Sequence, residues 1–352
     1  MMRSRIQVLG IPRKRLKEEL KGHGLTPFRA DQLYRWLFNR LVFDIDQMSD
    51  ISRSDRAALK EIIDISLPDI ADIKGSKDGT TKLLLKFSDG AMAECVLIPM
   101  RDYLTLCVSS QIGCKFNCKF CLTGKMGFVR NLEAHEITAQ YLVAKKHLAR
   151  SISNIVFMGM GEPLDNFGAV VDSIEVLYDN VGAAFSPNRL TVSTVGLVPK
   201  INRLAQSIPV SMAFSLSAPN DEIRDELMPI NKKYPIHKVL SALRAFPVKR
   251  GDQITLEYVM LKRVNDGIAH AQELAEKIGD PVRFKVNLIP FNFFPNSGFE
   301  PTGENDMLKF QSTLRSYGYL CYIRQSKGQK IFAACGQLGY FAMKRQPIDN
   351  RK

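Results

Sequence analysis

The stretch Gly113-Cys114-Lys115-Phe116-Asn117-Cys118-Lys119-Phe120-Cys121 separates three cysteines by three residues and then by two. Thiolates this close together are soft ligands that select iron–sulfur clusters, zinc or Cu(I). A structural zinc site or an ordinary iron–sulfur site takes four protein ligands, and this stretch supplies three. A [4Fe–4S] cluster held by three cysteines leaves one iron open for a substrate, and the spacing favours this interpretation.

Other uses of the three cysteines are weaker. Buried structural thiols are common, but they rarely cluster at this spacing beside Gly, Lys and Asn. Zinc would need a fourth ligand from Cys107, Cys335 or one of five histidines, which form no zinc-finger spacing. Seven cysteines is an odd number, and the chain start lacks the apolar stretch of a secretory signal, which disfavours stable disulfides. Zinc stays open as the alternative, and a reduced, cytoplasmic protein is expected.

Charge is the second informative property of the chain. Its 352 residues carry a net charge of +13, a level expected of a protein that binds a phosphate backbone. No run of about 18 apolar residues occurs, so no membrane span is expected. RNA or DNA is therefore favoured as substrate, with a merely solubilising charge as the alternative. The basic side chains gather before residue 23 (Arg3, Arg5, Arg13, Lys14, Arg15, Lys17, Lys21) and beside the cysteines (Lys115, Lys119, Lys125, Arg130).

The first part of the chain differs from the rest. Residues 12–21, 26–41 and 52–63 are predicted to be helices, from apolar side chains at helical spacing and from their start signals. Two apolar runs flank Ser88-Asp89-Gly90, which predicts a β-hairpin. The predicted domains are a helical RNA-binding domain (1–68), a hairpin extension (69–100), a catalytic core (101–340) and a tail (341–352).

From residue 101 onward, strand and helix patterns alternate, which predicts a parallel sheet with right-handed crossovers. About six such units are fewer than a closed eight-unit barrel needs, so we expect an open α/β partial barrel. The cysteine stretch follows the first strand, at the carboxyl edge where such sheets bind ligands. Strands are predicted at 104–109, 152–158, 189–195, 210–216, 254–261, 284–290 and 319–324, and helices at 132–148, 167–178, 197–206, 237–246, 267–278 and 304–317.

Small or polar residues end several of these strands. Gly161 and Glu162 end the second strand, where glycine lets backbone approach a ligand and the carboxylate could accept from an ammonium group. Taken singly, each of these residues is as well explained by a turn or a strand-end cap. The others are Ser193 after the third strand, Ser215-Leu216-Ser217 after the fourth and Asn292 after the sixth.

Three further residues have an ordinary interpretation from sequence alone. Cys107 lies within the first strand and Cys335 near the end of the chain, and both could be inert core thiols. Glu94 neighbours Cys95 in the second hairpin strand, on the opposite face, which predicts a solvent-facing carboxylate.

Together, the motifs resemble the RlmN/Cfr family of radical S-adenosylmethionine (SAM) RNA methyltransferases. The resemblance covers nearly the whole chain, and it is closer to the RlmN-like branch, which methylates C2 of adenosine, than to the Cfr-like branch, which methylates C8. The motifs are Thr105-Leu-Cys107-Val-Ser-Ser-Gln-Ile-Gly-Cys114 with Cys118 and Cys121, Gly127-Phe-Val-Arg-Asn-Leu132, Met158-Gly-Met-Gly-Glu-Pro-Leu164, Met228-Pro-Ile-Asn-Lys-Lys233, Ala333-Ala-Cys335-Gly-Gln-Leu338 and Phe28-Arg-Ala-Asp-Gln32.

The resemblance implies a (β/α)6 radical SAM barrel and a role for each site residue. Cys335 would carry a methyl group, Cys107 would release the product through a transient disulfide, and Glu94 would accept a proton. In two places the chain departs from the family pattern: Ser217 stands where His is common, and Phe291 where Trp is frequent. The remaining implied contacts are Cys114, Cys118 and Cys121 to a [4Fe–4S] cluster, and Gly161, Glu162, Ser193, Ser215, Leu216, Ser217 and Asn292 to SAM.

The resemblance also implies partners. The substrate would be 23S rRNA at the peptidyl transferase centre, together with an adenosine of the tRNA anticodon loop. A flavoprotein or ferredoxin-type reductant would supply electrons to a monomeric enzyme. The alternatives are a C8 methyltransferase of the same family and a non-enzymatic zinc protein that binds RNA.

Overall fold

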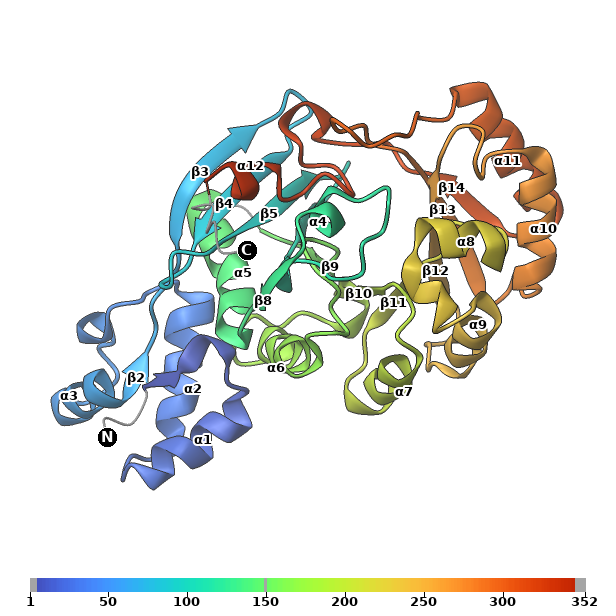
Figure 1. The fold of residues 1–352 in the computed structure, drawn as a ribbon. Helices are drawn as coiled ribbons and strands as arrows, with labels where there is room; N and C mark the ends of the chain where they lie inside the picture. Colours follow the sequence, from blue (N-terminus) through green and yellow to red (C-terminus); the bar gives the residue numbers. More distant parts are fainter. Residues whose placement is uncertain (1–4, 149–150, 346–352) are drawn as a thin grey trace.

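The computed structural model describes residues 5–148 and 151–345. Within them, one sheet joins ten strands in the order β14-β13-β12-β11-β10-β9-β6-β5-β4-β3 (Figure 1). Six parallel pairings connect β6 through to β14, and three antiparallel pairings add β5, β4 and β3. Because β14 and β3 are its two edges, the sheet is open, and the predicted partial barrel is confirmed.

The parallel part alternates strands with helices that cover one face of the sheet (Figure 1). Each strand and helix predicted for this part is present, with its ends displaced by a few residues. The strands are β6 (Leu104–Cys107), β9 (Asn154–Phe157), β10 (Leu190–Thr194), β11 (Ser211–Ser215), β12 (Ile254–Met260), β13 (Phe284–Pro290) and β14 (Leu320–Ile323), and the helices are α5 (Ala134–Leu148), α6 (Phe167–Tyr178), α7 (Val198–Ser207), α9 (Ile236–Ala245), α10 (Ile268–Ile278) and α11 (Glu304–Ser316).

The two faces of this sheet differ in chemistry. Leu256 and Tyr258 are fully buried toward the helices, and the ring of Tyr258 packs on Phe310 of α11. The alternate residues of the same strand, such as Glu257, point to the opposite face, which we call the inner face. Register partners share a face, so Ser215 lies beside Glu257 on the inner face. The inner face of this half of the sheet is therefore partly polar.

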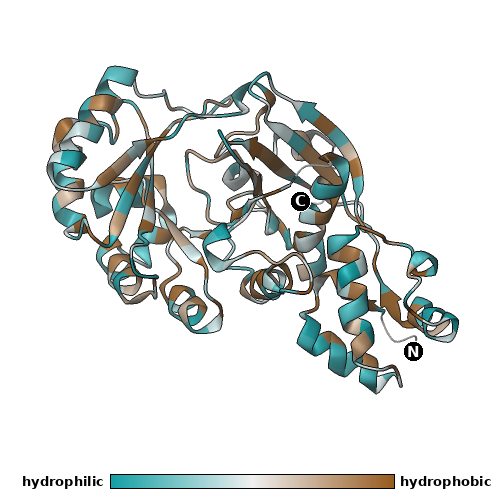
Figure 2. Cartoon of the chain, turned by 180° about the vertical axis from the view of Figure 1, so that it is seen from behind, coloured by the Kyte–Doolittle hydropathy of each residue, from teal (hydrophilic) through white to brown (hydrophobic). Residues whose placement is uncertain are grey.

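The antiparallel part extends the same sheet. Its strands are β3 (Asp69–Gly75), β4 (Thr81–Lys86) and β5 (Met92–Pro99), and β5 pairs with β6. The predicted hairpin is therefore present as β4 and β5, while β3 is a third strand that sequence reasoning did not identify. The strands are largely hydrophobic, whereas the helices show hydrophilic outer surfaces (Figure 2). Because the apolar side chains of these strands are buried, a shift of one residue in strand pairing would expose them, and this fixes the register of the sheet.

The N-terminal region is helical, as predicted, and ion pairs fasten it to the barrel. Arg13 contacts both Asp31 and Asp179, and Arg15 contacts Asp172 of α6. The hydroxyl of Ser52 accepts from the Asp55 amide and caps the third helix. The elements are β1 (Ile6–Gln7), η1 (Val8–Gly10), α1 (Arg13–Gly22), α2 (Phe28–Tyr34), the π-helix η2 (Arg35–Asn39), η3 (Ile45–Gln47), α3 (Arg53–Ile62) and β2 (Ile63–Asp64).

Short elements complete the chain. In Figure 1 the C-terminal helix α12 lies beside β3, β4 and β5. Among the described residues, no helix has both the length and the apolar character needed to cross a bilayer. Arg3 and the predicted tail from residue 346 lie outside the described residues. The short elements are β7 (Gln111–Gly113), α4 (Leu122–Lys125), β8 (Phe128–Asn131), η4 (Pro187–Arg189), α8 (Asp221–Leu227), η5 (Pro229–Lys232), η6 (Gln329–Ile331) and α12 (Tyr340–Arg345).

Candidate functional site

The three clustered cysteines lie on one loop at the carboxyl edge of the sheet, and we call residues 114–125 the cysteine loop. The backbone N–H of Cys114 donates to Gly127 O at 2.8 Å, which ties the start of the loop to β8. Cys121 precedes the short helix α4, and its N–H donates to Cys118 O. The loop therefore presents all three thiols from a single turn of chain, where the sequence predicts them.

The electrostatics of the cysteine loop fit a set of metal-cluster ligands. Burial raises the pKa of Cys114 to about 12, and the neighbouring Cys121 thiol adds to the rise. Burial also raises the pKa of Cys118, assisted by both other thiols. Such thiols stay protonated until a metal displaces the proton. Among the described residues, no three Cys, His, Asp or Glu side chains converge on one metal position. A [4Fe–4S] cluster does not require such convergence, because each thiolate binds a different iron.

Glu162 is a buried carboxylate beside this loop. It accepts from Thr194 Oγ1 at 2.7 Å, from the Val195 amide at 3.0 Å and from the Leu164 amide at 3.2 Å. Burial raises its pKa to about 7 in spite of these bonds. A carboxylate of this kind gains by pairing with a cationic ligand group.

Gly161 has a structural reason to be glycine that the sequence did not show. Its φ is +96°, and an added Cβ would lie 2.4 Å from the side chain of Gln111. The same Gln111 accepts from the Glu162 amide at 2.8 Å, so this close approach fixes the position of the carboxylate. The glycine was predicted to admit a ligand, and the structure shows that it admits a neighbouring side chain.

The strand-end residues fall into two groups. Ser193 and Ser215 share the inner face, because Ser193 pairs with Ala213 and Ser215 lies two residues further along β11. Ser217 is buried, adopts a φ of +51° and accepts from the Val259 amide, so its hydroxyl has an internal partner. The inner face thus presents the first two serines more directly than the third.

Arg224 of α8 is a residue of the site that the sequence did not indicate. It is fully buried and donates to three backbone carbonyls at the ends of β10 and β11, at 2.8 to 3.0 Å. It also donates to Asn231, and its guanidinium lies over Phe214. Burial lowers its pKa to about 10. No motif identified it, because the carbonyls come together only in the fold. They belong to Val195, Ser215 and Leu216.

Cys335 lies directly against the cysteine loop. We call residues 328–341 the C-terminal segment. The Leu122 amide donates to Gly336 O at 2.7 Å, and Thr123 Oγ1 donates to Leu338 O at 2.7 Å. Asn292 is buried and donates to Cys335 O at 3.0 Å. Its side-chain amide, which was predicted to contact SAM, is therefore hydrogen-bonded to the C-terminal segment. Cys335 is exposed, although these bonds anchor the segment that carries it, so it is not the inert core thiol that the sequence alone allowed.

Cys107 and Cys335 belong to the same site. Cys107 is buried on β6, and burial together with the nearby Cys335 thiol raises its pKa well above the ordinary value. Although Cys335 is exposed, the protein atoms around its thiol partly desolvate it and raise its pKa to about 11, and the Glu257 carboxylate adds to the rise. Both thiols are free. The other two cysteines, Cys95 and Cys321, are buried core residues.

Glu94 is fully buried, and the solvent-facing interpretation from the strand pattern is wrong. Register places it on the inner face, two residues from Val96, which pairs with Cys107. Its carboxylate accepts from Lys82 Nζ at 3.1 Å, from the Gly339 amide at 3.0 Å and from the Phe341 amide at 3.1 Å. These three donors hold the Glu94 carboxylate in place.

Much of the predicted basic surface is engaged within the protein. Lys115 pairs with Asp165 at 2.6 Å, Arg130 pairs with Glu136 at 2.7 Å, and Lys125 donates to Asn296 O. Lys119 is exposed at the cysteine loop. Fewer basic side chains around the cysteine loop are therefore available for RNA than the number of charges in the sequence indicates.

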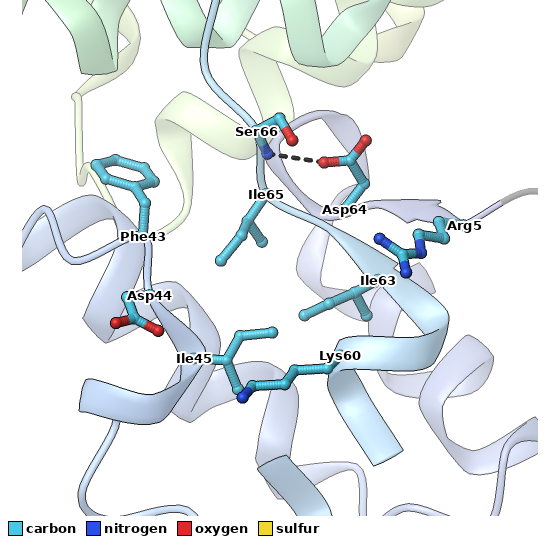
Figure 3. Close-up of a pocket in the computed structure, with 9 residues that line it drawn as sticks. All are labelled: Arg5, Phe43, Asp44, Ile45, Lys60, Ile63, Asp64, Ile65 and Ser66. Carbon is cyan, nitrogen blue, oxygen red and sulfur yellow. Dashed lines mark hydrogen bonds between the residues drawn. The ribbon is translucent and has the colours of Figure 1, made fainter. Parts of the chain in front are cut away.

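A hollow of about 410 Å³ lies away from these residues, in the N-terminal region (Figure 3). Its charged lining is mixed, because it contains Arg5 and Lys60 as well as Asp44 and Asp64. The Ser66 amide donates to Asp64 at 2.8 Å, and the Lys60 ammonium pairs with Asp46. None of the predicted site residues lines this hollow, so the candidate site stays at the carboxyl edge of the barrel.

Comparisons with known proteins agree with this geometry. Residues 108–276 match the radical SAM superfamily model, and residues 6–65 match a model described as the ribosomal RNA large subunit methyltransferase N-terminal domain. The dual-specificity RNA methyltransferase RlmN of Marinobacter nauticus is 44% identical over 343 residues, which cover 95% of this chain and 92% of that protein. The crystal structure of a radical SAM methyltransferase from Sphaerobacter thermophilus superimposes with a TM-score of 0.89 and 38% identity, over 95% of this chain and 99% of the other.

Proposed function

Because this chain belongs to the RlmN family of radical SAM RNA methyltransferases, we propose that it methylates C2 of adenosine in 23S rRNA and in tRNA. One observation carries the proposal. The C-terminal segment is hydrogen-bonded to the cysteine loop through Leu122 and Gly336, and it holds an exposed thiol, Cys335, at that loop. A thiol beside a cluster-binding loop is placed to carry a group between a cofactor and a substrate.

The cysteine loop fits the cofactors of the radical SAM superfamily, a [4Fe–4S] cluster and SAM. Cys114, Cys118 and Cys121 would hold the cluster through three thiolates, which leaves one iron open to SAM. When bound, these cofactors supply the methyl group and the radical chemistry that the electrophilic C2 carbon of adenine requires.

The strand-end residues are proposed to bind SAM, and the geometry supports this role more strongly for some of them than for others. Glu162 would hold the methionyl ammonium, because its buried carboxylate gains by pairing with a cation. Ser193 and Ser215 would donate to SAM from the inner face. Ser217 and Asn292 have internal partners, so they would act by shaping the pocket, with Gly161 and Leu216 contributing backbone.

Cys335 and Cys107 would carry and release the methyl group. Cys335 would first accept a methyl group. That methyl group would lose one hydrogen atom to the radical chemistry of the cofactors, and its carbon would then bond to adenine C2, with the surplus electron passing back to the cofactors. The Cys107 thiol would lose its proton and attack the Cys335 sulfur to form a disulfide, and the electron pair of the carbon–sulfur bond would pass to the methylene carbon, which takes up a proton. An external reductant would restore both thiols. The electrostatic influence of Cys335 on Cys107 supports this pairing.

Glu94 would accept the C2 proton of the linked adenine. Its position on the inner face with Cys107, and the three donors that fix the position of its carboxylate, support this role. The adenosine must leave its stack to reach the barrel, which fits an RNA base that is extruded for chemistry.

The N-terminal region is proposed to bind RNA through fewer basic residues than its number of charges indicates. Arg13, Arg15 and Lys17 pair with carboxylates inside the protein. Lys14 and Lys21 are exposed, and in the described part of the chain no carboxylate pairs with them. We assign phosphate contacts to these two lysines. A flavoprotein or ferredoxin-type reductant, a monomeric state and a cytoplasmic location complete the proposal.

Nucleoside analysis of rRNA and tRNA from a deletion strain tests this function. We expect 2-methyladenosine to be absent from both RNAs, to return with the intact gene and not to return with Cys335→Ala. A strain that loses only 8-methyladenosine would identify the C8 alternative. A purified protein that holds zinc, without iron or sulfide, would support the non-enzymatic alternative.

A further inference from the structure

Lys82 is a buried cation on the inner face of the sheet. It lies on β4 with a side chain that is 2% exposed, and it pairs in register with Val96, the partner of Cys107. Register therefore brings Lys82, Glu94 and Cys107 onto one face. Burial lowers the pKa of Lys82, and the Glu94 charge opposes that fall.

The ammonium of Lys82 joins two parts of the proposed site. It donates to Glu94 Oε2 at 3.1 Å and to the carbonyl of Phe332 at 2.9 Å, three residues before Cys335. It also lies 4.3 Å from the centre of the Phe341 ring, six residues after Cys335. The Lys82 side chain thus contacts the carboxylate proposed as base. It also contacts the C-terminal segment at one residue that precedes and one residue that follows the cysteine proposed as methyl carrier.

A purely structural role does not account for this choice of residue. A buried ion pair is costly to desolvate, and replacing such a pair by apolar side chains of similar size is often neutral or stabilising. A buried carboxylate that must accept a proton has a different need, since burial favours its neutral form and an adjacent cation favours its charged form. Lys82 supplies that cation at hydrogen-bond distance.

We propose that Lys82 is a positioning residue for the proposed methyl transfer, which orients the Glu94 carboxylate and ties it to the segment carrying Cys335. The inference rests on the proposed function. It assigns to β4, outside the parallel barrel, a part in the release of the product. Lys82 need not touch RNA or SAM to have this effect.

The test compares Lys82→Met, Lys82→Arg and the matched control Lys74→Met. Lys74 also lies over the Phe341 ring, at 5.3 Å, but it pairs with Asp72 on the surface and does not contact Glu94. For Lys82→Met we expect unchanged iron content and SAM binding, and a fall in RNA methylation of roughly 100-fold or more. We also expect a covalent protein–RNA adduct to persist on denaturing gels, because proton removal is slowed. Lys82→Arg should restore part of the turnover, and Lys74→Met should behave as wild type.

The outcomes separate this inference from the proposed function. Wild-type turnover by Lys82→Met would overturn the inference while leaving the function intact. A parallel loss of iron, SAM binding and thermal stability in both Lys82→Met and Lys82→Arg would show a structural role and also overturn it. If the wild-type protein itself made no methylated adenosine, the proposed function would fail first.

Discussion

The cysteine loop and the C-terminal segment both present cysteines to one site, but they are built in different ways. The cysteine loop is local, since its three thiols come from one short turn of chain. The C-terminal segment depends on distant partners, and the bond from the Gly339 amide to Glu94 spans 245 positions of sequence. A cofactor-binding motif can thus be recognised locally, whereas the position of Cys335 depends on the whole fold.

We expect the largest effect from a substitution in the cysteine loop. Cys118→Ala removes a thiolate for which no other ligand substitutes, so iron content and RNA methylation should both fall to background. The matched control is Cys95→Ala, which removes a buried thiol that belongs to the strand core. Iron analysis and nucleoside mass spectrometry measure both variants. A cluster-loaded, active Cys118→Ala protein would contradict the role assigned to the cysteine loop.

We expect a smaller effect from a substitution that separates the C-terminal segment from the cysteine loop and changes no cysteine. Gly339 has a φ of +103°, and an added Cβ would lie 2.0 Å from the Met126 sulfur, just beyond the cysteine loop. Gly339→Ala should push the C-terminal segment away, retain iron and lower methylation on the order of 100-fold, because the reacting groups are misplaced.

The control for that variant is Gly251→Ala. Gly251 also has a positive φ, +87°, but an added Cβ there meets nothing within 4 Å. It shares the backbone strain and lacks the clash, so its activity should stay near wild type. Equal activity in the two variants would show that contact between the regions is not required.

The smallest effect sharpens the electrostatics of the site. The pKa of Glu162 is raised to about 7 by burial, so the group is mainly charged at pH 8 and mainly protonated at pH 6. SAM affinity should therefore weaken by roughly tenfold from pH 8 to pH 6, and Glu162→Gln should remove this dependence. Calorimetric titration with SAM measures both. An unchanged pH dependence in Glu162→Gln would exclude this carboxylate as the titrating group.

The same group also affects stability, with the opposite sign. Its pKa in the folded protein lies above the ordinary value of 4.5, so the folded state binds more protons than the unfolded chain between about pH 4.5 and 7. The contribution of Glu162 to the stability of the ligand-free protein should then decrease as the pH rises through that range. Denaturant unfolding of wild type and Glu162→Gln at both ends of the range measures the difference.

The fold was largely predictable because its signals are local. The alternation of strands and helices after residue 101, the Ser52 cap and the hairpin turn each follow from short-range patterns, and each is present. The strand β3 was missed because it is the exposed edge of the sheet and lacks a clear alternation of apolar residues. Its pairing with β4 supplies the order that its own sequence does not.

The site was predictable only where chemistry and sequence spacing coincide. The three clustered cysteines and Glu162 stand out in their motifs, whereas Lys82 and Arg224 read as ordinary charged residues of a strand and a helix. Their roles depend on carbonyls and carboxylates brought together by long-range packing. Glu94 was misjudged from strand alternation because the C-terminal segment covers the inner face at that position.

We propose that Cys335 carries the methyl group and that Cys107 releases the product. To test this directly, Cys107→Ala protein that holds its cluster is incubated with SAM, a reductant and substrate RNA, and the products are analysed by denaturing gel and mass spectrometry. We expect a covalent adduct in which a methylene carbon links Cys335 to adenine C2, with little free methylated RNA. Free methylated RNA at the wild-type rate, or an adduct on another residue, would contradict it.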